Sequence, residues 1–563
     1  MIYHCEDHTC NYWDEGEKLP ERCPQCGRKL LRANETDMTG DDWTALGNTL
    51  WDAEASDKKR MVDCFRKAAY LGSAWGVCNL GICMEQGNGV EADPVQAFWL
   101  YQQAVEMGSL NAVCCLGVCY QYGIGTAPDA EKAAELYCKA AEYGSPRGQM
   151  LLARAFHDGI GVEADAAEAV HWVRAAAYQR YGEGMYRLGV CYEYGDGVEQ
   201  NWEHAVHWFR EAAESGVSTA MTDLGYCYEK GCGVEQSWEQ AFSWYRRGAE
   251  CGYPVSMSNL GLCYKRGYGV EQNWQEAVKW YEQGAQCGHL QSMDNLAYCY
   301  EYGEGVEQNE ERALYWYRRG AEAGSDYCMY CLGWNYSNGE GVEQNMTEAI
   351  RWYTAAAEGG NADAMHNLGW HYDHGEGVEQ DMKKAICWYE RAAEQNHPAA
   401  MNSLGECYAM GRGVPRDLET AMEWYRRAAE LGEAMADYNM GWHLEQAGKL
   451  SEAYAHYRKA ADGNDDSAWW ALGRFYENGV VVAQDGKEAR CCYETGEKLG
   501  SVKCKMRLAR CKLLGIGGRR AKKAGLDLCR QALELAKESS EKEDYGYEAE
   551  MNLLRRTIAE NES

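Results

Sequence analysis

A Leu-Gly pair, or a close variant of it, returns at a fixed interval along most of this 563-residue chain. The anchor residue of the pair recurs every 36 positions, at Leu80, Leu116, Leu152, Leu188, Leu224, Leu260, Leu296, Leu332, Leu368, Leu404 and Met440. Leu46, Leu472 and Leu508 extend the series at intervals of 34, 32 and 36 residues. Because a chain this long exceeds the size of one globular core, this period predicts a repeat array.

A turn and a second helix follow each anchor in the middle of the chain. A Gly-x-Gly-Val turn, such as Gly195 to Val198, permits positive φ and ends the first helix. The expected N-caps of the second helices are Asp93, Asp129, Asp165, Asn201, Ser237, Asn273, Asn309, Asn345, Asp381 and Asp417. The second helices are expected to close at Gly216, Gly252, Gly288, Gly324, Gly360, Asn396 and Gly432.

Tryptophans also recur at the repeat period, in the second helix. They are Trp172, Trp208, Trp244, Trp280, Trp316, Trp352, Trp388 and Trp424. We expect them to be core struts rather than parts of a cofactor site, because the small residues around them let helices approach closely.

Composition limits the function classes. The net charge of -31 repels polyphosphate, so a nucleic-acid reader along the whole length is unfavourable. The amino terminus lacks the pattern of an export signal, and no run of about 18 apolar residues occurs, so we expect a cytoplasmic protein that does not enter membranes. The 27 cysteines are then expected to be reduced thiols.

The pattern Leu-Gly-x-x-Tyr-x-x-Gly-x-Gly-Val, a capping Asp or Asn, Ala-x-x-Trp-Tyr and Ala-Ala-x-x-Gly together resemble the Sel1-like repeat, a relative of the tetratricopeptide repeat. The resemblance implies an all-α protein, a right-handed α/α solenoid of about 13 to 14 helix-turn-helix repeats over residues 37–540. It also implies an adaptor for protein complexes without catalytic residues. We expect a capping helix over residues 541–563.

Some bacterial members of that family carry a disulfide in each repeat and have been associated with β-lactam binding. The regular cysteines here sit differently, three residues after the anchor and without a periodic partner on the second helix. They are Cys83, Cys119, Cys191, Cys227, Cys263, Cys299, Cys407 and Cys511. The disulfide-bonded branch is therefore disfavoured.

Residues 1–36 precede the array and carry four cysteines at zinc-ribbon spacing. Cys5 and Cys10 form one half and Cys23 and Cys26 the other, so we expect one structural Zn²⁺. Cys5 with His8 is an alternative first pair. The segment also resembles rubredoxin, which would imply iron and electron transfer, although the wider gap between Cys5 and Cys10 weakens that likeness.

A partner surface is expected on the first helices. Positions one residue before, two after and six after the anchor face away from it. On several repeats these positions carry aromatic and amide side chains, namely Tyr226, Asn295, Tyr298, Tyr302, Trp334, Asn367, Trp370, His374 and Trp442. We expect them to line a concave groove for an extended peptide, the alternative being that they pack against neighbouring repeats.

Residues 501–530 hold ten basic side chains against one acidic residue, Asp527. Anion binding or head-to-tail self-association is expected from Lys503, Lys505, Arg510, Arg519, Arg520, Lys522 and Lys523. A solvated terminal cap is the alternative.

No nucleophile elbow, zinc-protease helix or phosphate loop occurs in the sequence. The chain is therefore expected to be a non-enzymatic scaffold for a peptide or protein partner. Two other functions stay open. One is a redox or hydrolytic enzyme that uses the amino-terminal metal, and the other is nucleic-acid or anion binding through the ribbon and the basic end.

Overall fold

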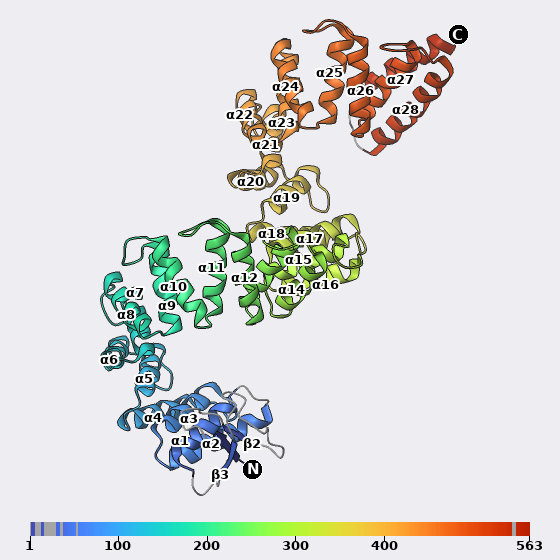
Figure 1. Ribbon diagram of the computed structural model, residues 1–563. Helices are drawn as coiled ribbons and strands as arrows, with labels where there is room; N and C mark the ends of the chain where they lie inside the picture. Colours follow the sequence, from blue (N-terminus) through green and yellow to red (C-terminus); the bar gives the residue numbers. More distant parts are fainter. Residues whose placement is uncertain are drawn as a thin grey trace. The chain divides into compact units, whose positions relative to one another are not determined.

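The structure is a computed structural model that describes residues 2–5, 13–15, 30–33, 38–51, 55–542 and 548–562 (Figure 1). The chain divides into two compact units, unit 1 over Met1–Ser292 and unit 2 over Met293–Ser563. Each unit is described by itself.

Unit 1 begins with three short strands, β1 Ile2–Cys5, β2 Trp13–Glu15 and β3 Leu30–Ala33. β1 lies between the other two and pairs antiparallel with both, so that Ile2 stands opposite Glu15 and Ala33. Cys10, Cys23 and Cys26 lie outside the described residues, as does the side chain of Cys5. The zinc ribbon therefore stays a prediction.

The rest of unit 1 is helical. Its helices are α1 Gly40–Thr49, α2 Ala55–Tyr70, α3 Ala74–Gln86, α4 Pro94–Glu106, α5 Leu110–Tyr122, α6 Ala130–Glu142, α7 Pro146–Asp158, α8 Ala166–Tyr178, α9 Gly182–Tyr194, α10 Trp202–Glu214, α11 Ser218–Lys230, α12 Trp238–Glu250, α13 Pro254–Arg266 and α14 Trp274–Gln286.

Unit 2 is helical throughout the residues that the structure describes. It contains most of α15 Leu290–Tyr302, then α16 Glu310–Glu322, α17 Asp326–Asn338, α18 Met346–Glu358, α19 Ala362–His374, α20 Met382–Glu394, α21 Pro398–Met410, α22 Leu418–Glu430, α23 Ala434–Gln446, α24 Leu450–Asp462, α25 Asp466–Asn478, α26 Gly486–Lys498, α27 Val502–Leu514, α28 Lys522–Lys542 and α29 Glu548–Glu562.

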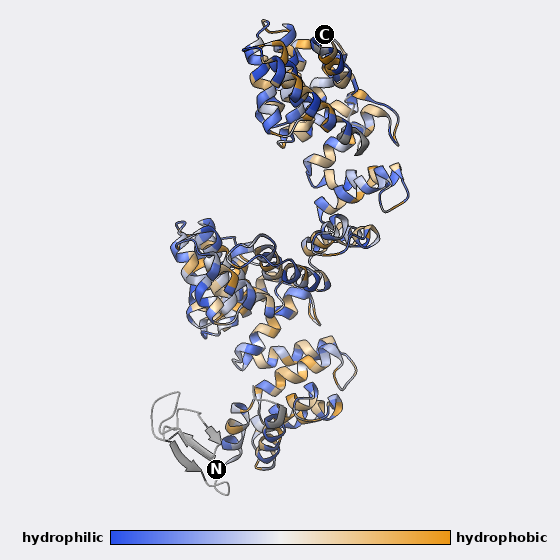
Figure 2. Ribbon diagram, turned by 90° about the vertical axis from the view of Figure 1, so that its right-hand side faces the viewer, coloured by the Kyte–Doolittle hydropathy of each residue, from blue (hydrophilic) through white to orange (hydrophobic). Residues whose placement is uncertain are grey.

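Within each unit the helices form an α-solenoid of stacked pairs, as the sequence predicts. The two helices of a pair pack together, and the second helix then packs on the first helix of the next pair. First helices of consecutive pairs also touch, for example α5 with α7 and α25 with α27. Hydrophilic and hydrophobic residues are mixed along the helices (Figure 2). None of the described helices combines the length and hydropathy that crossing a bilayer requires.

The predicted helix ends are confirmed. The first helix α9 ends at Gly195, which has a φ of 75°, and α10 begins after Asn201, whose side chain accepts a hydrogen bond of 3.0 Å from the His204 amide. All ten predicted N-caps make this kind of bond. The glutamine just before the cap was missed by sequence reasoning. Gln200, for instance, donates to the Glu193 carbonyl at 2.8 Å and so caps the end of the first helix.

The turn glycines also serve packing between pairs. A Cβ on Gly125, the second glycine of its turn, would collide with the carbonyl of Pro94 on the preceding second helix. The same holds for Gly269 and Trp238. The Gly-x-Gly turn thus combines positive φ with a close approach between neighbouring pairs.

The predicted role of the tryptophans is wrong in part. Only Trp244 is buried, and the other seven lie half-buried on the second helices. Most are followed in sequence by the aromatic ring that fills the core, as Tyr389 follows Trp388. A helix turns by about 100° per residue, so adjacent residues cannot both point at the anchor. Three of the half-buried rings, those of Trp352, Trp388 and Trp424, instead lie under an arginine side chain, such as Arg391 over Trp388 at 4.3 Å.

The buried aromatic explains the glycine of each Leu-Gly pair. A Cβ on Gly405 would lie 2.5 Å from Cε1 of Tyr425, so only glycine admits the ring. Six of these tyrosines also donate their hydroxyl to a side chain on the first helix, across 2.6 to 2.9 Å. The pairs are Tyr101–Glu85, Tyr137–Gln121, Tyr245–Glu229, Tyr317–Glu301, Tyr457–Glu445 and Tyr493–Glu477. Each ring is thereby buried with a satisfied polar group.

Candidate protein-interaction surface

Four aromatic residues occupy the same position on the first helices of unit 2, two residues after the anchor. They are Tyr298 on α15, Trp334 on α17, Trp370 on α19 and Trp442 on α23, and we call them the aromatic stripe. The three tryptophan side chains are 44%, 37% and 38% exposed. Two residues along a helix correspond to about 200°, so burial of the anchor leaves this position facing outward.

Neighbouring side chains hold several of these rings in place. Trp370 stacks on His374 with ring centroids 4.3 Å apart, and Nδ1 of His374 lies 2.9 Å from the Trp370 carbonyl oxygen. Tyr298 lies against Tyr302, with ring centroids 4.6 Å apart. The structure thus brings the predicted residues together in pairs along one helix face, as the spacing suggests.

The predicted asparagines are less exposed than the rings. Asn295 and Asn367 are half-buried. Asn439, which occupies the same repeat position on α23, donates from Nδ2 to Oδ1 of Asn402 at 3.0 Å and to Oε1 of Glu406 at 3.3 Å. Its amide is thus bound within the unit, because consecutive first helices touch at this position.

A charged cluster interrupts the aromatic stripe on α21. Glu406 stands there in place of an aromatic residue, and Oε2 of Glu406 lies 3.6 Å from Nη2 of Arg412. Arg412 also pairs with Asp373, a buried carboxylate on α19, across 3.0 Å. Burial raises the pKa of Glu406, while Arg412 opposes that rise. A cavity of about 460 Å³ beside this cluster is lined by Glu406, Arg412, Met410, Asn439 and Trp442, among others.

Tyr226 belongs to unit 1, on α11, and is 45% exposed. The ammonium of Lys230 lies 5.8 Å from its ring centroid.

The basic carboxy-terminal segment is partly engaged within unit 2. Arg507 binds both carboxylate oxygens of Glu550 at 2.7 Å, and Arg510 pairs with Glu477. Arg520 donates to Oδ1 of Asn561 at 2.7 Å. Within unit 2, Arg510 is thus met by Glu477 on α25 and Arg520 by Asn561 on α29.

The remaining basic residues of that segment differ in exposure. Lys503 lies 5.3 Å from the ring centroid of Trp470, and Lys505 is half-buried. Arg519, Lys522 and Lys523 are exposed. Anion binding and self-association there stay predictions, on a smaller set of side chains.

A histidine cluster on α19 and α21 escaped sequence reasoning, because its members come from neighbouring repeats. Nε2 of His366 lies 3.4 Å from Oγ of Ser403, and its ring stacks on His397 with centroids 5.1 Å apart. His397 in turn meets Asp363 at 3.1 Å. Burial lowers the pKa of His366 to about 4. In a Ser-His-Asp triad the aspartate orients the histidine that contacts the serine. Here Asp363 pairs with His397, whereas the histidine beside Ser403 is His366, so these residues do not form that arrangement.

Metal-binding groups and disulfides were also sought in the described part of the chain. No three His, Cys, Asp or Glu side chains gather there as ligands would. The twenty-three cysteines from Cys64 to Cys529 are free thiols. Seven of the eight periodic cysteines are buried in the core, where burial raises the pKa of a thiol such as Cys263 to about 12.

Comparison with known proteins agrees with this geometry. The family model described as the Sel1 repeat matches twelve segments, 76–109, 112–145, 146–181, 182–217, 218–253, 254–289, 290–325, 326–361, 362–397, 398–433, 434–465 and 468–501. No curated protein matches the chain.

Solved structures are also similar. One is c5321, a protective antigen present in uropathogenic Escherichia coli strains that displays an SLR fold, with 29% identity and a TM-score of 0.58. The similarity covers 76% of this chain and 94% of that one. A Sel1 repeat protein from Oxalobacter formigenes is 28% identical, with a TM-score of 0.45 and coverage of 56% and 93%. Yeast Tom70 is 13% identical, with a TM-score of 0.31 and coverage of 87% and 96%.

Proposed function

The chain belongs to the Sel1 repeat family, whose repeats generally act as protein-interaction modules, and from this we propose that it is a non-enzymatic scaffold that binds an extended peptide of a protein partner along the aromatic stripe. The peptide would lie across the first helices α15 to α23 of unit 2. Each first helix would then contribute a side chain to its recognition.

The exposure of three tryptophans at one repeat position carries this proposal. Trp334, Trp370 and Trp442 each present more than a third of their side chain to solvent, while the anchors Leu332 and Leu368 are buried. Large aromatic side chains that stand in a row on a surface are typical of interaction sites, and tryptophan is enriched among the residues that dominate binding energy.

Charge favours a particular kind of peptide. The chain carries a net charge of -31, and Glu406 adds a carboxylate next to Trp442 within the same cavity. A segment with apolar side chains for the stripe and a basic residue for Glu406 fits this surface best. Such a basic residue would share the Glu406 carboxylate with Arg412.

The double variant Trp334→Ala/Trp370→Ala tests the proposal. Truncation of a tryptophan at the centre of such an interface costs about 2 kcal/mol, so loss of both rings should weaken binding of the partner roughly a thousandfold. Partners captured by wild-type protein and identified by mass spectrometry would be measured for affinity against both proteins. The far-ultraviolet circular dichroism should stay unchanged.

Trp99→Ala is the matched control, since Trp99 is 53% exposed but lies on a second helix, α4. It should retain every partner. Retention of all partners by a folded Trp334→Ala/Trp370→Ala protein would contradict the proposal, as would an equal loss in Trp99→Ala.

A further inference from the structure

One helix pair of unit 1 lacks the core aromatic ring that the other matched pairs carry. The residue 21 positions after the anchor is a fully buried tyrosine or phenylalanine in most pairs, for example Tyr137 and Phe209 in the pairs on either side. In the pair α7 and α8 this residue is Val173. The glycine that normally admits the ring is Ala153, and His157 stands where a glutamate or glutamine usually receives the tyrosine hydroxyl.

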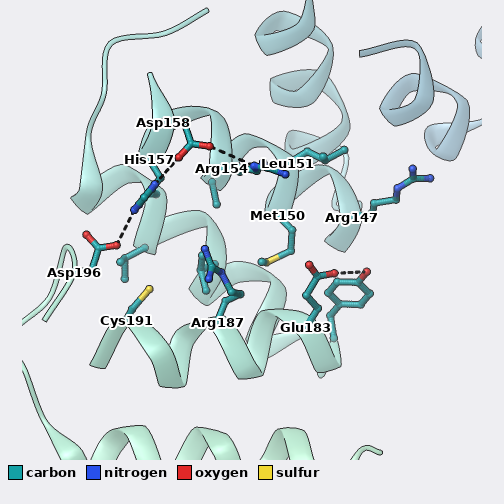
Figure 3. A pocket seen from close by; sticks show the side chains of 15 residues that line it. Arg147, Met150, Leu151, Arg154, His157, Asp158, Glu183, Arg187, Cys191 and Asp196 are labelled. Atoms are coloured by element: carbon teal, nitrogen blue, oxygen red, sulfur yellow. Dashed lines mark hydrogen bonds and ion pairs between the residues drawn. The ribbon is translucent and has the colours of Figure 1, made fainter. Parts of the chain in front are cut away.

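A cavity of about 560 Å³ lies at this place, and Ala153, His157 and Val173 are all in its lining. Its lining residues come mainly from α7 and α9 (Figure 3). Met150, Leu151 and Val173 supply apolar walls. Its volume is within the range of small-ligand sites and suits one or two residues of a peptide.

The polar side of the cavity offers a free positive charge. Arg187 rises from α9 into the middle of the cavity (Figure 3). Within the part of the chain that the structure describes, Arg187 has no ion-pair partner. Arg147 also lines the cavity, but its guanidinium turns away and meets the Cys115 sulfur at 3.5 Å.

The acidic residues of the cavity are bound to other side chains. His157 lies between two carboxylates, with Nδ1 2.7 Å from Asp158 and Nε2 3.2 Å from Asp196. Arg154 adds a 3.3 Å contact to Asp158. Glu183 accepts a hydrogen bond from the Tyr181 hydroxyl at 3.4 Å. These carboxylates therefore leave the guanidinium of Arg187 available to a ligand.

We propose that this cavity binds a carboxylate attached to an apolar group, as at the C-terminus or an acidic side chain of a peptide, with Arg187 pairing the carboxylate. Arginine binds a carboxylate through two parallel hydrogen bonds, and the apolar walls receive the neighbouring side chain. A doubly charged phosphate fits less well, because Asp158, Glu183 and Asp196 would repel it. The site lies in unit 1 and does not depend on the aromatic stripe.

Three short peptides test the proposal on the full-length protein. Acetyl-Ala-Leu has a free carboxylate, acetyl-Ala-Leu-amide has none, and acetyl-Glu-Leu-amide has one only on its side chain. Methyl resonances of Met150, Leu151 and Val173 would report binding by NMR. We expect the neutral amide to bind at least tenfold more weakly than the better of the two carboxylate peptides. The peptide that binds more tightly shows whether the cavity prefers a C-terminal or a side-chain carboxylate.

Two variants locate the site. Arg187→Gln should weaken the better carboxylate peptide at least tenfold, whereas Arg246→Gln should leave its affinity unchanged, since Arg246 is an exposed residue of α12 that pairs with Glu250. The double variant Ala153→Gly/Val173→Tyr rebuilds the ring of the other pairs. It should abolish binding while keeping the protein at least as stable to heat.

Several results would overturn the proposal. These are equal binding of the neutral amide, full affinity in Arg187→Gln, and full affinity in the ring-filled variant with native circular dichroism. Inorganic phosphate provides the remaining comparison. The assignment of a carboxylate ligand is wrong if phosphate shifts these methyl resonances in wild type but not in Arg187→Gln, while neither carboxylate peptide shifts them.

Discussion

Single residues titrate outside their ordinary range where the helix pairs bury them. Burial raises the pKa of Asp465, the N-cap of α25, from 3.8 to about 6, with Asp466 and Glu433 adding repulsion. The hydrogen bond of 2.7 Å that its side chain accepts from the Ala468 amide works in the other direction. The cap is therefore better suited to a neutral acceptor than to a charge.

Asp465→Asn tests this balance, because asparagine keeps the cap acceptor and removes the charge. A raised pKa in the folded state stabilises the fold at low pH, and this stability is lost as the pH rises through about 6. Between pH 4.5 and pH 7.5 the free energy of unfolding of wild type should therefore drop by roughly 2 kcal/mol relative to that of Asp465→Asn. Thermal unfolding of both proteins at the two pH values measures the change.

Asp485→Asn is the control, since Asp485 is an exposed N-cap on α26. Its thermal unfolding measures the effect of the same amide substitution at a solvent-exposed cap. A gap between wild type and Asp465→Asn that does not widen with pH would show that the burial of Asp465 has no effect on stability.

Packing between the two helices of a pair depends on the glycine of the Leu-Gly motif and the ring that faces it. In two pairs alanine replaces this glycine and a smaller residue replaces the ring. They are Ala153 with Val173, and Ala509 with Cys529. A small residue opposite leaves room for the extra methyl group. Nothing in the structure explains how Ala297 is accommodated with Tyr317 opposite it.

Gly405→Ala should destabilise the protein by about 1–2 kcal/mol, although the same change in a helix normally stabilises by about 1 kcal/mol. The reason is the Tyr425 ring, which a Cβ at position 405 would approach to 2.5 Å. In a Tyr425→Val background the sign should reverse, as in the natural Ala153 and Val173 pair. Urea unfolding of the four proteins gives both values.

The exposed end of the same helix supplies a control. Met410→Ala, at a side chain that is 60% exposed, should change the free energy of unfolding by less than about 0.5 kcal/mol. If Gly405→Ala costs the same with valine as with tyrosine at position 425, the ring is not the cause.

At the scale of the whole molecule, stability in each unit comes from contacts between neighbouring pairs. The pair formed by α27 and α28 is covered by α29, which packs on both helices. Met506, Leu513, Cys529 and Leu554 form the core of this end. Arg507 is held there by Glu550 on α29. In such arrays the loss of a terminal element affects its neighbours first.

Removal of residues 548–563 should therefore expose only the end of unit 2. Amide hydrogen exchange should quicken in α27 and α28, on which α29 packs, while α17 to α20 keep their protection. The point variant Glu550→Gln is the milder comparison, since it weakens the Arg507 pair and keeps the apolar cover. Uniform loss of protection across unit 2 after the truncation would contradict the nearest-neighbour picture.

The period, the caps and the helix-ending glycines could be predicted from the sequence, because each depends on residues a few positions apart. Leu368, Gly375 and Asp381 mark one pair with no knowledge of its neighbours. The outward position of Trp334 and Trp370 also follows from helical geometry alone. The amino-terminal cysteines carry their own spacing signal, and their metal stays a prediction.

Only the tertiary structure decided which groups meet across repeats. Glu477 and Glu550 reach Arg507 from 30 and 43 positions away, so a segment that is strongly basic in sequence is partly neutralised in the fold. The cavity at Val173 likewise could not be predicted from local spacing, because side chains from α7, α8 and α9 together enclose it. Local spacing predicts where helices begin and end, whereas contacts between distant residues determine which charges stay free and which spaces stay open.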